Sequence, residues 1–163
     1  MSAENLRSKD WEHRLQVLWA WRRSRHDSAT SDRDKGANYR AVLDGCAVTV
    51  RALCCIIGVD CRFTGRFPSD GRNRPQELIA CCKKGKSFVS ALPPEHQRCL
   101  LEVLYLANRA VAHPSDGEGL DHQVGPPEMT DAINTVLVWL QARKSQWPAL
   151  GGVPEEYFTP IPT

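Results

Sequence analysis

The feature that most constrains the fold is a long amphipathic pattern between residues 39 and 57. Apolar side chains recur there every three or four residues over five turns, which is the spacing of one face of an α-helix. Gly58 follows the last of them and suits the left-handed residue that ends many helices. The apolar positions are Tyr39, Val42, Leu43, Cys46, Val50, Leu53, Cys54 and Ile57. A long helix with one apolar face must be covered by other elements, so the pattern predicts a helical core.

Four further segments combine apolar periodicity with the signals of helix ends. Asp10 and Thr130 suit the N-cap position, and Pro75 and Pro94 suit the first turn of a helix. The predicted helices cover about residues 10–26, 75–85, 94–113 and 130–146. The sequence therefore predicts an all-α fold, an antiparallel helical bundle of about five helices with long polar loops.

The segments between these helices are polar and rich in glycine, proline and serine. Residues 28–36 are expected to form a solvated loop, and residues 60–74, which hold four arginines, are expected to be irregular. A short hairpin through Phe63 and Phe67 is the alternative for the second segment. The loop over residues 115–128 is long for a compact domain, and loops of this length often carry function.

Length and composition are those of one ordinary globular domain. The chain has 163 residues, of which 42% are hydrophobic and 25% are charged. We expect a single helical-bundle domain over residues 1–147 and a proline-rich, extended C-terminal tail over residues 148–163. The longest apolar run, residues 52–59, is far shorter than the ~20 residues that cross a bilayer, and the first residues are polar where a secretory signal would be apolar. A cytoplasmic protein without a membrane span is therefore expected.

The seven cysteines indicate a reducing environment. Their number is odd, they include two adjacent pairs, and most lie within apolar helical patterns, unlike the cysteines of a disulfide framework. We expect free thiols that pack as small hydrophobic side chains.

The charge of the chain is uneven along its length. Residues 1–90 hold 17 Lys/Arg and 10 Asp/Glu, whereas residues 91–163 hold 4 Lys/Arg and 9 Asp/Glu. This asymmetry is compatible with an anionic partner on the first half, and equally with attraction between the two halves or between two subunits.

Two patterns were considered for cofactors and metals. Residues 80–87, ACCKKGKS, fit a permissive form of the phosphate-binding loop, which needs a strand before it and a glycine-rich turn leading into a helix N-terminus. The preceding PQELIA is predicted as helix, so these lysines are expected at a solvated helix end. His96 and Cys99 are three apart on a helix, but no Cys-x-x-Cys or His-Glu-x-x-His spacing occurs. We therefore expect neither a cofactor nor a metal.

A polar constellation lies at the end of the predicted helix 94–113. Arg109 and His113 are four residues apart and share one helix face, and Glu102 and Tyr105 fall on the same side. A polar stripe that ends in a histidine beside a long loop is typical of the mouth of a site. The alternative is structural: Arg109 pairs with Glu102, and His113 caps the last carbonyls of the helix.

The segment LANRAVAHP, residues 106–114, resembles the HEPN superfamily, small helical bundles in which an arginine precedes a histidine at a helix end. The family pattern has four to six residues between the two, and Arg109 and His113 enclose three. The resemblance implies a homodimer with the motif helices facing each other and either metal-independent cleavage of RNA or RNA binding. In that chemistry Arg109 holds the phosphate, Asn108 is a further donor, and His113 exchanges a proton with the ribose or the leaving oxygen, with Glu102 and Tyr105 in support.

Two functions remain open from the sequence. The favoured hypothesis is a small helical interaction or accessory protein that binds another protein or a small ligand. The alternative is a HEPN-like metal-independent ribonuclease or RNA-binding protein that uses Arg109 and His113. Both require the same helical scaffold, so the periodicity of the chain does not choose between them.

Overall fold

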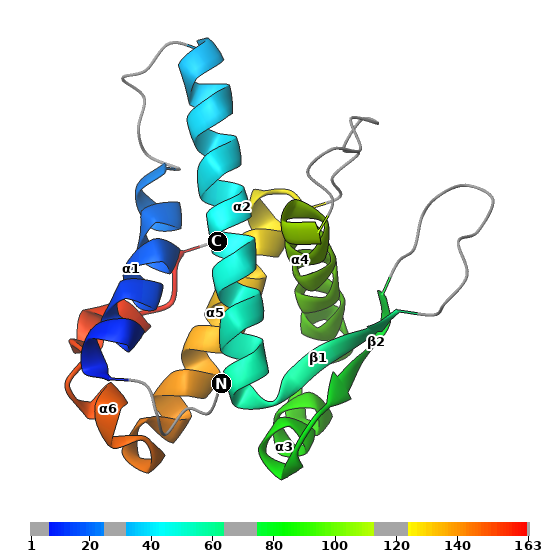
Figure 1. Ribbon diagram of the computed structural model, residues 1–163, viewed down its shortest axis with the longest axis vertical. Helices are drawn as coiled ribbons and strands as arrows, with labels where there is room; N and C mark the ends of the chain where they lie inside the picture. Colours follow the sequence, from blue (N-terminus) through cyan, green and yellow to red (C-terminus); the bar gives the residue numbers. More distant parts are fainter. Residues whose placement is uncertain (1–6, 25–31, 64–74, 113–123, 163) are drawn as a thin grey trace.

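Helix α2 (Asp32–Ile57) runs through the centre of the computed structural model, and the other elements pack around it (Figure 1). The structure describes residues 7–24, 32–63, 75–112 and 124–162. Its other elements are α1 (Ser8–Ser24), β1 (Val59–Phe63), β2 (Pro75–Ala80), α3 (Lys83–Ala91), α4 (Pro94–Ala112), α5 (Pro126–Arg143) and α6 (Pro148–Gly151), with 3₁₀ turns at Lys144–Gln146 and Glu155–Phe158. The predicted helical class is confirmed. Within the described ranges no helix is long and apolar enough to cross a bilayer.

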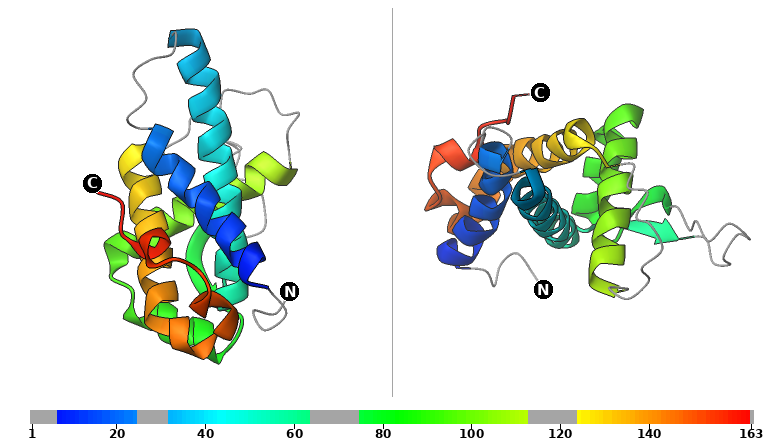
Figure 2. Two further views of the ribbon diagram at one scale, coloured as in Figure 1. Left: turned by 90° about the vertical axis from the view of Figure 1, so that its left-hand side faces the viewer. Right: turned by 90° about the horizontal axis from the view of Figure 1, so that it is seen from above.

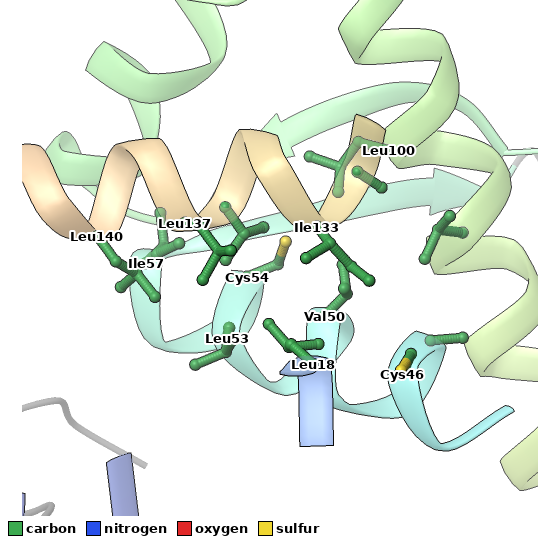
Figure 3. Close-up of a cluster of buried hydrophobic side chains, with 14 of the residues drawn as sticks. Leu18, Cys46, Val50, Leu53, Cys54, Ile57, Leu100, Ile133, Leu137 and Leu140 are labelled. Carbon is green, nitrogen blue, oxygen red and sulfur yellow. The ribbon is translucent and has the colours of Figure 1, made fainter. Parts of the chain in front are cut away.

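The hydrophobic core lies where α1, α4 and α5 meet α2. The predicted apolar face of α2 is buried there; Cys46 and Leu53, for example, are fully covered. Figure 3 shows these side chains together with Leu100 of α4 and Ile133 of α5, which are also buried. Fully burying one leucine or isoleucine contributes roughly 1.5–3 kcal/mol. The amphipathic pattern of residues 39–57 therefore identified the central helix correctly.

Helix α1 begins two residues before the predicted N-cap. Asp10 lies in its first turn, where the carboxylate accepts a hydrogen bond from the Arg7 backbone N–H at 3.0 Å. Further along the helix, the buried Trp21 donates from Nε1 to Thr130 Oγ1 on α5 at 3.0 Å. This bond satisfies a buried indole donor and joins α1 to α5.

Residues 75–80 form a strand, so the helix predicted over residues 75–85 is wrong. Strand β2 pairs antiparallel with β1 in a register that sets Val59 opposite Ala80. Six residues are too few to separate a strand period from a helix period, and pairing with β1 decides the outcome. Gly58 ends α2 as predicted, and its φ of 87° turns the chain directly into β1.

Helices α4 and α5 lie close to their predicted positions, but α5 begins earlier. It starts at Pro126 after an N-cap at Gly125, whose N–H donates to Glu128 Oε2 at 3.0 Å. Thr130, the predicted N-cap, is instead fully buried inside the helix. The proline and the acidic residue of the first turn were the better signal for this helix start.

The C-terminal segment is not the extended tail that was predicted from its prolines. It forms α6 and a 3₁₀ turn, and its apolar side chains are buried in the same core as the helices. Asn134 on α5 holds the end of the segment by donating to the Ile161 carbonyl at 2.8 Å and accepting from its N–H at 2.7 Å. Pro148 begins a short helix, a position where its missing N–H costs nothing. The buried side chains of the segment are Leu150, Val153, Phe158 and Ile161.

The predicted loops are only partly within the described residues. Residues 32–36 belong to the start of α2 and not to a loop, because a polar stretch can extend a helix whose later turns are anchored in the core. Residues 126–128 likewise belong to α5. Residues 60–63, which the sequence predicts as irregular, form most of strand β1. The remaining parts of the predicted loops and of the alternative hairpin, residues 28–31, 64–74 and 115–123, lie outside the described residues.

Candidate functional site

A concave site with apolar walls lies between α3, the start of α4 and α5. We call it the α3–α5 groove, and its volume is about 480 Å³, within the range of ligand sites. Helix α5 forms one wall through a single stripe that begins at Asp131 and ends at Arg143. Figure 2 shows α5 and α3 from two further directions. The other wall and the mouth are formed by Ser87, Phe88, Ala91, Leu92, Pro93 and His96.

The floor of the groove is aromatic. Phe88 of α3, which is 4% exposed, meets Trp139 of α5 edge to face, with ring centroids 5.3 Å apart and planes at 84°. Trp139 also contacts Trp147, whose centroid lies 5.5 Å away. Beside this cluster Val138 is 56% exposed, although valine usually lies inside. The groove therefore offers a supported aromatic floor and an uncovered aliphatic side chain.

A histidine–aspartate pair lies at the mouth of the groove. His96 Nδ1 lies 2.7 Å from Asp131 Oδ1 and 2.8 Å from Oδ2, and the two side chains are 39% and 25% exposed. With Nδ1 as the donor to the carboxylate, the ring is oriented and Nε2 is left for other partners. Within the described residues Nε2 has no hydrogen-bond partner in the protein. The pair can therefore present one oriented polar atom to a bound molecule.

Neither nearby nucleophile completes a catalytic triad with this pair. Ser87 Oγ donates to the Lys84 carbonyl at 2.8 Å instead of to the imidazole. Burial and the charge of Asp131 raise the pKa of the Cys99 thiol, and the carboxylate further opposes its ionisation through a hydrogen bond. A hydroxyl or thiol nucleophile requires an adjacent base that removes its proton. Neither Ser87 nor Cys99 is therefore positioned as a nucleophile activated by His96.

Arg143 lies at the opposite end of the groove, and Lys84 lies on α3 one turn before Ser87, which lines the groove. Lys84 Nζ lies 5.6 Å from the ring centroid of Trp147, and Arg143 Cζ lies 5.6 Å from that of Trp139. Contacts of this kind hold a cation over an aromatic face while leaving its donors accessible. The two tryptophan rings contact each other, so both cations lie against one aromatic cluster.

Of the residues predicted from the sequence, Glu102, Tyr105 and Asn108 lie on α4 and do not line this groove. Arg109 is in the last turn of the helix, but its side chain and all of His113 lie outside the part that the structure describes. Asn108 is half-buried, and its amide donates to Cys61 Sγ on β1 at 3.7 Å. Glu102 and Tyr105 are half-buried on the same helix. The convergence of Arg109 and His113 therefore stays a prediction.

The phosphate-loop-like segment ACCKKGKS has a strand before it, contrary to the prediction of helix there. It nevertheless lacks the phosphate-binding turn, because α3 already begins at Lys83. Gly85, predicted as a helix end, lies in the first turn of α3 against the preceding hairpin. A Cβ atom at this position would lie 1.9 Å from the Gly58 carbonyl oxygen, so the glycine permits a close approach of two backbones. Among the described residues no group of three or more His, Cys, Asp or Glu could hold a metal ion.

Sequence reasoning missed the groove because its parts are far apart in the chain. His96 was noted for its spacing from Cys99, but its partner is Asp131, 35 residues away. A surplus of apolar positions on α5, with Val138 outside the core stripe of Ile133, Val136, Leu137 and Leu140, was the one available signal.

Comparison of the sequence with protein-family models and with curated proteins, and of the fold with solved structures, finds no match. The function of this chain is therefore inferred from its own geometry.

Proposed function

We propose that the protein is a cytoplasmic interaction module whose α3–α5 groove binds an apolar segment of a partner protein. The observation that carries this proposal is the exposure of Val138, 56%, next to the Phe88–Trp139 pair in a concave site. Apolar surface that is exposed, contiguous and backed by rigid aromatic rings is typical of binding sites. Its burial by a partner would stabilise the complex by the same effect that stabilises the core.

The shape of the groove suits a helix or a short extended segment. Its α5 wall runs from Asp131 to Arg143, about 18 Å at 1.5 Å per helical residue. That length accommodates some three turns of a partner helix, with apolar anchors at i, i+4 and i+7 over the aromatic floor. The oriented imidazole of His96 supplies a polar contact at the mouth, which fixes orientation more than it adds affinity.

A peptide library displayed on phage tests the proposal without knowledge of the natural partner. Clones selected on the wild-type protein are compared for binding to Val138→Asp and to a matched control, Val48→Asp, on the exposed part of α2. A charge in the groove should abolish binding of most clones, whereas the control should bind them as the wild type does. The proposal fails if no clones are enriched, or if enriched clones bind both variants equally well.

A second candidate is metal-independent cleavage of RNA by Arg109 and His113, as the HEPN resemblance implies. The supporting observation is the extent of α4, whose last turn contains Arg109 and which ends at the residue before His113. An RNA cleavage assay in the presence of EDTA compares wild type, Arg109→Ala and His113→Ala, with folding checked by circular dichroism. Loss of cleavage in both variants supports a nuclease. A wild-type protein that neither cleaves nor binds RNA rules this candidate out.

A further inference from the structure

The basic end of the α3–α5 groove lacks counter-charges. Within the described residues Lys84 and Arg143 form no salt bridge, and Arg143 donates only to the neutral Gln146 at 3.5 Å. Neighbouring Lys144, in contrast, pairs with Glu155 at 2.6 Å. The fold thus neutralises one cation of this region, whereas Lys84 and Arg143 have no anionic partner among the residues that the structure describes.

The N-terminus of helix α3 and its own lysines are both positive. The first turn of α3 contains Lys83, Lys84 and Lys86 and no acidic residue, and its N-cap, Cys82, makes no side-chain cap. Positive side chains near a helix N-terminus are repelled by the helix dipole, which favours anions there. The dipole and the side chains therefore reinforce one positive field next to the aromatic floor.

The other end of the groove carries the opposite charge. Asp131 lies at the mouth, where it is held by His96 and remains 25% exposed. The groove is consequently polarised along its length, from Asp131 at one end to Arg143 at the other. A partner segment of matching polarity would place carboxylates over the cations and keep donors near Asp131.

We infer that the partner segment is acidic as well as apolar, with at least one Asp or Glu that pairs with Lys84 and Arg143. This inference rests on the proposed function, because it specifies the ligand of the same groove. The apolar anchors contribute most of the affinity, and the carboxylates select the partner and its direction, since exposed ion pairs add little affinity but penalise mismatched charge.

The test uses the library clones that bind wild type and fail on Val138→Asp. These clones should be enriched in Asp and Glu over Lys and Arg. The double variant Lys84→Glu/Arg143→Glu should weaken their binding about tenfold, because it removes two ion pairs and adds repulsion. The control Lys9→Glu/Arg23→Glu changes the net charge equally on exposed positions of α1 and should have little effect. Lys84→Glu alone, at an exposed position, repeats the test if the double variant does not fold.

The outcomes separate the inference from the function on which it rests. Groove-dependent clones that are neutral or basic, or that bind Lys84→Glu as tightly as wild type, overturn the acidic partner and leave the interaction module intact. The absence of any clone sensitive to Val138→Asp removes the interaction module itself. Self-association in analytical ultracentrifugation that Val138→Asp abolishes would identify a second copy as the occupant and would also overturn the inference.

Discussion

The backbone of Gly85 in α3 packs directly against the backbone of Gly58 at the end of α2. In Gly85→Ala the new Cβ would lie 1.9 Å from the Gly58 carbonyl oxygen and 2.6 Å from its carbon. Ordinary contacts of this kind are about 3.5 Å. Both neighbouring atoms belong to the backbone, so no flexible side chain can move aside. Helix α3 would have to shift by about 1.5 Å or more away from the hairpin to restore that separation.

The expected cost follows from two opposing effects. Overpacking that displaces backbone costs roughly 1–3 kcal/mol or more, and alanine in place of glycine in a helix regains up to ~1 kcal/mol. We expect Gly85→Ala to lower the free energy of unfolding by about 2 kcal/mol, which for a chain of this size lowers Tm by roughly 4–8 °C.

The matched control is Gly45→Ala in the middle of α2. Its nearest neighbour would be Val17 Cγ1 at 4.0 Å, so the methyl group fits. This variant should gain up to ~1 kcal/mol from helix propensity. Urea unfolding followed by circular dichroism measures both changes. If Gly85→Ala is as stable as wild type while Gly45→Ala behaves as expected, α3 does not pack against Gly58, and the α3 wall of the groove is not where the structure puts it.

Three other predictions follow from buried groups. Thr130→Val removes the acceptor of the buried Trp21 indole and should cost about 1–3 kcal/mol in urea unfolding, whereas Thr130→Ser should recover most of it. A thiol reagent should label the exposed Cys55, Cys81 and Cys82 rapidly in the native protein, and the buried cysteines only on unfolding. Rapid labelling of all seven cysteines would contradict the burial. Burial raises the pKa of Cys46 to about 12 and of Cys61 to about 11. Above pH 9.0, the ordinary pKa of a thiol, these thiols therefore ionise in the unfolded state but stay protonated in the folded state. Below that pH their protonation does not change the free energy of unfolding. Above it, stability should fall by up to ~1.4 kcal/mol per pH unit for each such thiol, a loss that Cys46→Ala should reduce.

The helices of the core were predictable because their signal is local and long. The apolar face of α2 spans five turns, and α4 lies between a proline start and the residue before His113. A pattern of that length averages out individual exceptions. Strand β2 had no such signal: PQELIA fits either period, and its state depends on pairing with β1 from another part of the chain.

One physical reason explains why neither the groove nor the fold of the C-terminal segment could be predicted from the sequence. Each depends on contacts between residues distant in sequence, such as Trp11 stacked on Trp147 at 5.7 Å and His96 bonded to Asp131. The prolines of the C-terminal segment predict an extended chain, but a proline equally begins a helix. Whether the segment is extended or helical depends on whether its apolar side chains pack against the core, as Phe158 does.

These long-range contacts also explain the phosphate-loop-like segment. Its glycine, Gly85, is used for the approach to Gly58, and the Lys86 N–H already donates to the Cys82 carbonyl at 3.0 Å as part of the helix. A phosphate cradle needs such amides free to point at the ligand. The fold therefore uses the backbone of the segment for packing, and no described residue forms a salt bridge with its lysines. The proposed acidic partner segment of the α3–α5 groove would pair with this charge.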